Sequence, residues 1–396
     1  MPRQDPLALP PVPPPAPATH PRRDALLAAG FALALAAGGL GALRTPAQSA
    51  LELEARARAP WPALAFSRSV PADFERAFSD RFGGRNTLLR LHHAAMVYGF
   101  GVSPAPNVMI GRDAWLYFLG EDGRSLARHY RGTTAVSDAE ITAVASELKR
   151  RRAFLAAHGI AYVVTVAPDK YTIYPEHLPA WVGGAAPATP LARLVAALRA
   201  DGSVNFVDLR APLMAAKSRE PVYYTTDSHW NMLGAAVAYE ALMRAVQRAL
   251  PPGRLPSIAP AVLPTYVPGE DVYAGDLARQ VGFLPRYREP DYAPFAKVLG
   301  SDAAAARCAK RTDDGKDEGF EFYACANDAL PRALVLRDSM AIPLIPLLSE
   351  NFSRVVYVSS RRLDPALVLR EKPDVVIEEM VERSLTAPAA LPMPAP

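Results

Sequence analysis

Near the C-terminus stands the run Ala333-Leu334-Val335-Leu336-Arg337-Asp338-Ser339-Met340, in which an apolar stretch passes into a polar turn. A short apolar run bounded by polar residues is typical of a buried strand. The following segment, 341–351, has helical character but contains Pro343 and Pro346. We therefore predict that Ser339 lies at a strand-to-helix turn. Such a turn presents a side-chain oxygen and directs backbone N–H groups toward a bound oxyanion.

Further apolar runs rich in β-branched residues indicate more strands of the same kind. They lie at Ala161–Ala167, Asn205–Leu209, Arg354–Val358 and Asp374–Ile377. Helical stretches alternate with them, at Asp138–His158, Leu191–Ala200, Leu233–Leu250 and Pro365–Glu371. Apolar strands between helices predict an α/β fold whose parallel sheet is covered on both faces. Ligands of such sheets bind at the carboxyl ends of the strands, and Ser339 follows one such end.

A second motif lies about a hundred residues earlier, Thr226-Asp227-Ser228-His229-Trp230-Asn231. Asp227 and His229 are two residues apart, so their side chains point the same way if the segment is extended or a tight turn. A strongly helical run follows at 232–243, which places the pair on a loop at a helix start. A carboxylate that orients an imidazole, together with a hydroxyl, is the requirement for a nucleophilic triad. We predict that Ser339, His229 and Asp227 form one.

Each motif also has a structural interpretation. Asp338-Ser339 taken alone is more often a helix cap, and the Asp227–His229 pair alone would equally suit a cap followed by a packed histidine. Trp230 is expected to pack beside the site, and Asn231 is more readily a helix cap than an oxyanion donor. The chain contains no HExxH motif, so we expect neither a metal ion nor a cofactor.

Taken together, the motifs resemble the alginate O-acetyltransferase family, the AlgJ/AlgX-like proteins with an SGNH-hydrolase-like domain. The resemblance runs from about residue 50 to about residue 385. Besides the two motifs above, its segments are Asp80–Asn86, Val108–Tyr117, Val166–Pro175, Gly275–Ala278, Lys372–Glu378 and Glu382-Arg383. It implies an SGNH-hydrolase-like, flavodoxin-like three-layer sandwich with a parallel sheet. It also implies Ser339 as nucleophile, His229 as base and Asp227 as its acid partner.

Two features depart from the general SGNH pattern. A glycine commonly precedes the Asp-Ser pair, and Arg337 stands there instead, which leaves the oxyanion donors open. The Asp-His pair precedes the serine, which indicates a permuted order of the same groups. Candidate substrate contacts are Lys170, Tyr171, Trp230, Asn231, Arg337 and Arg383. We interpret Lys170 by default as solvated, and Glu378, Glu379, Glu382 and Arg383 as an ion-paired surface.

The N-terminal region indicates export. Residues 25–43 are an uninterrupted apolar or glycine run of nineteen, close to the ~20 residues that span a bilayer. Arg22-Arg23 favours an N-terminus inside the cell. We expect a single-pass inner-membrane protein with its catalytic domain in the periplasm, although a cleaved signal peptide would also export the body. The expected regions are a proline-rich cytoplasmic arm (1–24), the membrane helix (25–43), a helical region (44–110), the acetyltransferase domain (111–384) and a tail (385–396).

The remaining composition restricts the function without selecting it. The chain has 396 residues, half of them apolar, and a net charge of only +4, so nothing suggests nucleic-acid binding. Its only cysteines, Cys308 and Cys325, lie in a polar insertion at 301–328, where an oxidising compartment would favour a disulfide between them.

The family resemblance implies transfer of acetyl groups to an exported polysaccharide, with a multi-pass membrane O-acyltransferase as donor. The sequence leaves two alternatives open. One is an SGNH-type esterase or deacetylase that uses the same triad, because water and sugar hydroxyls are both competent acceptors. The other is a polysaccharide-binding scaffold of a secretion complex, in which the triad is incomplete in space.

Overall fold

The structure is a computed structural model of the full chain and describes residues 21–44, 57–62, 67–120, 136–182, 189–258, 272–282, 286–290, 308–311, 320–325 and 327–386. It divides into two compact units, 1–91 and 92–396. Residues 1–20 of the predicted arm (1–24) and residues 387–396 of the predicted tail (385–396) lie outside the described residues.

The first unit contains α1 (Pro21–Arg44), α2 (Val70–Arg81) and most of α3 (Arg85–Ala94). Helix α1 covers the segment 25–43 for which we predicted a helix. Among the residues that the structure describes, no helix combines the length and the apolar character needed to cross a membrane.

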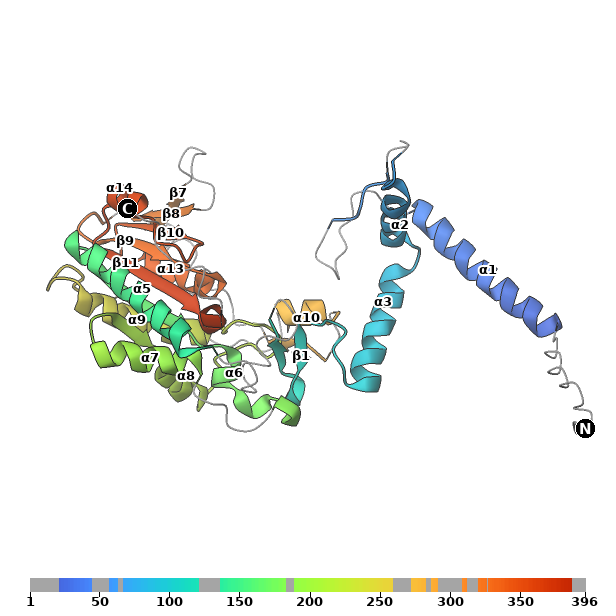
Figure 1. The fold of residues 1–396 in the computed structure, drawn as a ribbon, viewed down its shortest axis with the longest axis horizontal. Helices are drawn as coiled ribbons and strands as arrows, with labels where there is room; N and C mark the ends of the chain where they lie inside the picture. Colours follow the sequence, from blue (N-terminus) through green and yellow to red (C-terminus); the bar gives the residue numbers. More distant parts are fainter. Residues whose placement is uncertain are drawn as a thin grey trace, which may run out of the picture. The chain divides into compact units, whose positions relative to one another are not determined.

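A seven-stranded sheet forms the centre of the second unit (Figure 1). Its order is β4-β3-β11-β9-β10-β8-β7. The strands are β3 (Ala161–Ala167), β4 (Asn205–Asp208), β7 (Cys308–Arg311), β8 (Phe320–Cys325), β9 (Arg332–Leu336), β10 (Arg354–Val358) and β11 (Val375–Val381). The first five of the order run parallel, and therefore the carboxyl ends of β3, β9 and β11 meet at one edge.

Alternating side chains of these strands face two separate hydrophobic cores, as the pleat of a strand requires. Val163, Val335 and Ile377 belong to the core that includes α9 (Met232–Ala249). Val164, Leu334 and Val376 belong to the other, with residues of α5, α7 and α14. These helices span Asp138–Ala157, Pro190–Asp201 and Pro365–Glu371. The result is the three-layer α/β arrangement that the sequence predicted.

The purely parallel sheet that we predicted is wrong, because β8 pairs antiparallel with β10 and β7 antiparallel with β8. Both strands belong to the polar insertion, and a hairpin can add to a sheet edge without a crossover helix. Cys308 and Cys325 are register partners in this hairpin. Cys325 is disulfide-bonded, and Cys308 is the only other cysteine of the chain.

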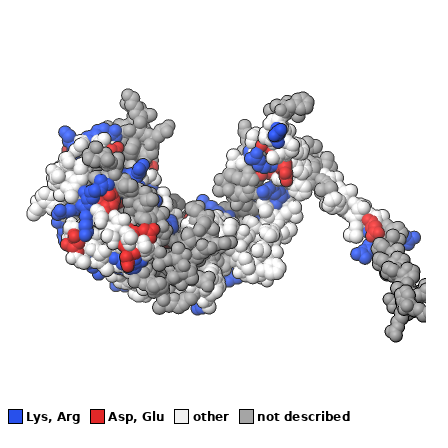
Figure 2. All heavy atoms as spheres, viewed as in Figure 1, with Lys and Arg blue, Asp and Glu red and all other residues white. Residues whose placement is uncertain are grey.

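Shorter elements complete the second unit. Near its start are η1 (Ala95–Gly99), β1 (Val108–Ile110), η2 (Arg112–Ala114) and β2 (Leu116–Phe118). After β3 come α6 (Lys170–Ile173), η3 (Pro175–His177), η4 (Ala180–Val182) and α8 (Arg210–Lys217), and later β5 (Val272–Tyr273), α10 (Asp276–Gln280) and β6 (Glu289–Pro290). The C-terminal part adds η5 (Ser339–Leu344), α13 (Ile345–Ser349) and η6 (Glu382–Thr386). Basic and acidic side chains are interspersed on the described face in view, in keeping with the small net charge (Figure 2).

Candidate active site

Ser339 is the first residue of η5 and lies just beyond the carboxyl end of β9. Its side chain is exposed. The preceding residue, Asp338, caps the helix, because its Oδ1 accepts the Met340 N–H at 2.9 Å and its Oδ2 accepts the Val381 N–H at 2.7 Å. This carboxylate therefore fixes the turn to β11. The Ser339 N–H at the helix start has no acceptor within the helix, so it is available to an oxyanion.

His229 joins Ser339 to Asp227. Its Nε2 is 2.8 Å from Ser339 Oγ, and its Nδ1 is 2.6 Å from Asp227 Oδ1. Since an ionised carboxylate only accepts, Nδ1 carries the hydrogen and Nε2 is left to accept the serine proton. Asp227 Oδ1 also accepts the backbone N–H of His229 at 3.0 Å, which is the local turn expected from their spacing. The structure thus brings the three predicted side chains into one hydrogen-bonded chain.

The Asp227 carboxylate is nearly buried, with 3% of its surface exposed, and is held from its far side. The Tyr273 hydroxyl and the Asp276 N–H, at 2.9 Å, both donate to Oδ2. Burial alone would raise the pKa of Asp227, but the His229 hydrogen bond and charge, Tyr273 and the Asp276 N–H together lower it below its ordinary value. The carboxylate therefore stays ionised beside the imidazole.

Asp276 is a second carboxylate near the imidazole, because its Oδ2 is 3.8 Å from His229 Nδ1. It accepts the Ser228 N–H at 2.7 Å and the Ser228 hydroxyl at 2.6 Å. Burial and the neighbouring Asp227 raise its pKa. Asp227, His229 and Asp276 each place a potential metal-ligand atom within 4.8 Å of the others. In this structure the same groups hydrogen-bond one another or Ser228.

Two charged side chains, the partly buried Glu289 and the buried Lys170, hold the segment before Asp227. The Glu289 carboxylate accepts the N–H groups of Thr225 and Thr226, each at 2.7 Å. From the other side, Lys170 Nζ donates to Thr225 O at 3.2 Å and to Leu116 O at 2.8 Å. Burial lowers the pKa of Lys170 to about 8, although Glu289, Asp227 and Asp276 oppose the shift. The expectation that Lys170 is solvated is wrong, because two distant carbonyls satisfy its ammonium inside the fold.

The acidic residues at the end of β11 are also buried, so their interpretation as a surface is wrong. Glu378 binds Arg151 at 2.7 Å, and Glu379 Oε2 accepts the Asp338 N–H at 3.2 Å. Glu382 accepts the Asp169 N–H at 2.9 Å, and Arg383 pairs with Asp169 at 2.9 Å. Burial and the Asp338 charge raise the pKa of Glu379 well above its ordinary value. Burial and Asp169 raise the pKa of Glu382 to about 7.

The other predicted contacts pack around the site rather than pointing into it. Tyr171 is buried and donates to Phe118 O at 2.6 Å. Trp230 is buried against Tyr223. Asn231 caps α9 by accepting the Gly234 N–H at 3.0 Å and donates to Pro221 O at 2.6 Å. Arg337 is partly buried and lies 3.3 Å from Glu321. Of the six candidate substrate contacts, Arg337 and Arg383 are the ones that keep part of their side chains accessible.

Asp227 and the segment before it are held by three residues to which the sequence analysis assigned no role. They are Tyr273, Asp276 and Glu289. The one indication in the sequence was that Asp276 lies in Gly275–Ala278, a segment of the family resemblance. Nothing in the residues linked it to the Asp227 loop. The link is a close backbone approach, because Gly275 N–H donates to Thr226 Oγ1 at 3.0 Å.

Comparison with known proteins gives the same assignment as the motifs. The family described as "SGNH hydrolase-like domain, acetyltransferase AlgX" matches residues 108–313, a range that includes Asp227 and His229 and ends before Ser339. A protein of Azotobacter vinelandii named "Probable alginate O-acetylase AlgJ" is 26% identical over 325 residues, which are 76% of this chain and 77% of that protein. Its namesake from Pseudomonas putida is 30% identical over 246 residues, 61% of this chain and 57% of the other.

Two solved structures resemble the chain more distantly. The O-acetyltransferase domain of Pseudomonas putida AlgJ has a TM-score of 0.42 at 23% identity and covers 70% of this chain and 92% of that one. Bacillus cereus PatB1 has a TM-score of 0.49 at 16% identity and covers 70% and 96%. With scores below 0.5, these likenesses add nothing to the family assignment, which rests on the sequence match.

Proposed function

Because the chain belongs to the family of SGNH hydrolase-like acetyltransferases typified by AlgX, we propose that it transfers acetyl groups through Ser339 to hydroxyl groups of an exported polysaccharide. The observation that carries this proposal is the continuous contact from an exposed hydroxyl to a buried carboxylate. It runs from Ser339 through His229 to Asp227 over 2.8 Å and 2.6 Å. A scaffold without catalysis would not need this arrangement.

In the first half of the proposed reaction, His229 Nε2 takes the Ser339 proton as Oγ attacks an acetyl carbonyl. The Ser339 N–H at the start of η5 stabilises the tetrahedral oxyanion. Collapse of this intermediate breaks the bond to the donor's leaving group, which receives the proton from His229. Asp227 stabilises the imidazolium during the step.

In the second half, the same imidazole deprotonates a sugar hydroxyl, which attacks the acetyl-serine. Collapse releases the acetylated sugar and returns the proton to Ser339, so the enzyme is regenerated. Because Ser339 is exposed, a polymer can reach it without a deep pocket. The names of the alginate O-acetylase relatives support a polysaccharide acceptor.

Compartment and partners belong to the same proposal. The apolar segment 25–43 supports an inner-membrane anchor with the catalytic unit in the periplasm. An exported enzyme cannot draw directly on cytosolic acetyl donors. We therefore include a multi-pass membrane O-acyltransferase as the partner that delivers the acetyl group.

The test uses the full chain, an activated acetyl ester and an oligosaccharide acceptor. We expect acetylated oligosaccharide from the wild type and none from Ser339→Ala. Ser359→Ala is the matched control, because Ser359 is an exposed serine that follows the neighbouring strand β10. Acetate release at the same rate with and without acceptor would instead establish the esterase. Turnover that survives in Ser339→Ala would refute the nucleophile.

A further inference from the structure

Asp276, the first residue of α10, lies beside the imidazole of His229 although it is not a member of the triad. Three oxygen atoms lie within 3.8 Å of His229 Nδ1. They are Asp227 Oδ1 at 2.6 Å, the Ser228 hydroxyl oxygen at 3.3 Å and Asp276 Oδ2 at 3.8 Å. The Nδ1 side of the ring therefore faces a second carboxylate in addition to the one that orients it.

The Ser228 hydroxyl connects this second carboxylate to the imidazole. It donates to Asp276 Oδ2 at 2.6 Å, so the lone pairs of its oxygen remain for the Nδ1 hydrogen of His229. The Ser228 N–H donates to Asp276 Oδ1 at 2.7 Å. Both oxygens of Asp276 thus accept hydrogen bonds, which is the arrangement of an ionised carboxylate. We call this connection the Ser228–Asp276 link.

The start of α10 is fastened to the loop that carries Asp227, so the position of Asp276 is fixed. The Asp276 N–H donates to Asp227 Oδ2 at 2.9 Å, and the Ala278 N–H donates to Thr226 O at 3.0 Å. A carboxylate in the first turn of a helix is favourable for the helix itself. That effect does not require contact with Ser228, because the Asp276 side chain is 39% exposed and could remain in water. The contacts with Ser228 therefore point to a role at the imidazole.

Titratable groups from several elements surround Asp276. They are Asp227, His229, Lys170 of α6, Tyr273 of β5 and Arg383 of η6. Burial and the charge of Asp227 raise the pKa of Asp276, whereas the hydrogen bonds from Ser228 and the charge of His229 lower it. A protonated His229 thus favours the ionised form of Asp276. Because such coupling is reciprocal, an ionised Asp276 favours the imidazolium that forms when Ser339 gives up its proton.

We propose that Asp276 is a positioning residue of the acetyl-transfer site, which holds the imidazole of His229 through Ser228 and shares the positive charge that the ring acquires. The inference rests on the proposed function and adds a residue to its machinery. The Ser228–Asp276 link reaches Nδ1 of the ring, whereas Ser339 contacts Nε2. The link therefore acts on the rate of the chemical steps and leaves substrate binding unchanged.

The experiment measures kcat and KM of the full chain for a small activated acetyl ester over a range of pH. Asp276→Asn removes the charge and keeps a carbonyl oxygen for the Ser228 N–H. Ser228→Ala removes the hydroxyl and keeps the charge. The double variant Asp276→Asn/Ser228→Ala shows whether the two changes act through the same link.

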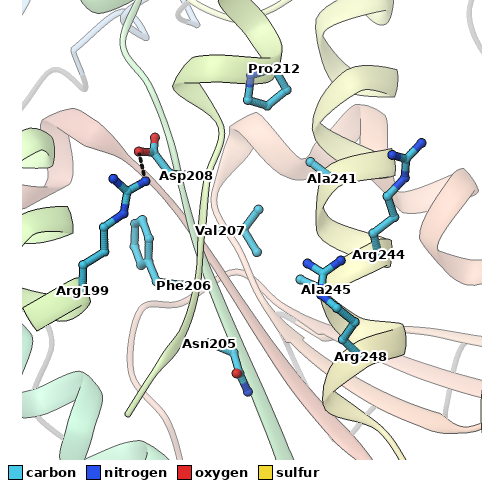
Figure 3. A pocket seen from close by; sticks show the side chains of 10 residues that line it. All are labelled: Arg199, Asn205, Phe206, Val207, Asp208, Pro212, Ala241, Arg244, Ala245 and Arg248. Carbon is cyan, nitrogen blue, oxygen red and sulfur yellow. Dashed lines mark hydrogen bonds and ion pairs between the residues drawn. The ribbon is translucent and has the colours of Figure 1, made fainter. Parts of the chain in front are cut away.

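The matched control is Asp208→Asn in β4. Asp208 is also a partly buried aspartate that accepts a backbone N–H, that of Arg210 at 3.2 Å. Figure 3 shows it beside the surface groove at β4, bonded to Arg199. Strands β3 and β11 lie between β4 and β9, so Asp208 is roughly 14 Å from the strand that precedes Ser339.

We expect kcat to fall by roughly tenfold to a hundredfold in Asp276→Asn and by about threefold in Ser228→Ala, with KM within about twofold of the wild type in both. The double variant should lose no more than Asp276→Asn, since both changes break the same link. Removal of a negative charge favours the neutral imidazole, so the acidic limb of the kcat/KM profile should move to lower pH by about half a unit in Asp276→Asn. Asp208→Asn should keep the rate and the profile of the wild type.

Several results would overturn the proposal. One is a kcat within twofold of the wild type in Asp276→Asn, and another is a raised KM at unchanged kcat. A third is a lower rate with the acidic limb unmoved, which a merely structural role would give, and a fourth is an equal loss in Asp208→Asn. If circular dichroism shows that Asp276→Asn does not fold, an unchanged kcat in Ser228→Ala overturns the proposal instead.

Failure of this proposal can be told apart from failure of the proposed function. The proposed function fails if turnover survives in Ser339→Ala, or if acetate is released at the same rate with and without acceptor. In the second case the effect of Asp276→Asn on kcat can still be measured, because hydrolysis uses the same imidazole. Wild-type kinetics in Asp276→Asn refute the Ser228–Asp276 link alone and leave Ser339-dependent turnover intact.

Discussion

Replacement of Gly275 by alanine should inactivate the site by displacing Asp227. A Cβ at this position would lie 2.5 Å from Asp227 Cβ and 2.4 Å from Thr226 O, whereas ordinary contacts begin at 3.4 Å. The loop must therefore move by about 1 Å to relieve both contacts. The backbone itself accepts alanine, because Gly275 has φ −68°. Movement of this size would stretch the 2.6 Å bond between Asp227 and His229 Nδ1 and release the imidazole from its orientation.

A displacement of about 1 Å in a catalytic group costs on the order of 10²-fold in rate. Loss of the correct tautomer sets a ceiling near 10⁴-fold. We therefore expect kcat/KM for an activated acetyl ester to fall by about 10²-fold in Gly275→Ala, with about 1–3 kcal/mol of destabilisation from overpacking. Circular dichroism at the assay temperature shows whether the variant remains folded.

Gly99→Ala is the control, because a Cβ at Gly99 meets nothing within 4 Å. It should keep the activity and stability of the wild type. If a folded Gly275→Ala variant kept kcat/KM within twofold of the wild type, the Asp227 loop could move without loss of activity. The tight approach of Gly275 would then have no part in catalysis.

Three further predictions concern the groups around Asp227 and η5. Tyr273→Phe removes a donor to Asp227 and should lower kcat/KM by roughly tenfold, whereas Tyr98→Phe at an exposed tyrosine should not. Lys170→Met leaves the two carbonyls it binds without their donor, so the free energy of unfolding in urea should fall by about 2–4 kcal/mol. The pKa of Glu382 is raised from 4.5 to about 7 in the folded state, so its stability contribution is present below pH 4.5 and lost as the pH rises through 7. Across that window the wild type should lose about 3 kcal/mol more than Glu382→Gln, which urea titrations of both proteins at pH 5 and pH 8 would measure.

The local hydrophobic pattern of the sequence was sufficient to predict the strands and helices that bury a continuous apolar run. The predicted bounds of the strands at 161–167 and 354–358 agree with β3 and β10, and the helix at 233–250 agrees with α9 within one residue at each end. The hairpin β7–β8 could not be predicted in the same way. Its residues are partly polar, and its pairing depends on an edge of β10 that the local sequence does not reveal.

The chemistry and the sequence positions of Ser339, His229 and Asp227 were sufficient to predict them as site residues. The contacts between them could be seen only in the structure. The carboxyl end of β9 and the loop before α9 are far apart in the sequence and meet only in the folded chain, where His229 contacts Ser339. Residues that support the triad from a distance gave no local signal. Glu289 stands in a short segment without a motif, yet it fixes the backbone of Thr225 and Thr226.

The buried acidic residues at the end of β11 show why the prediction of an ion-paired surface was wrong. They also show what burial does to the charge of these side chains. Charged residues in a run normally face solvent, and solvent would keep them ionised. An ionised Glu379 would add negative charge beside the turn that carries Ser339, because its carboxyl group accepts the Asp338 N–H. Burial raises the pKa of Glu379 and of Glu382, and Arg383 pairs with Asp169 in the same cluster. The raised pKa of Glu379 favours its uncharged form, which would lessen the repulsion that an anion at the proposed Ser339 site would meet.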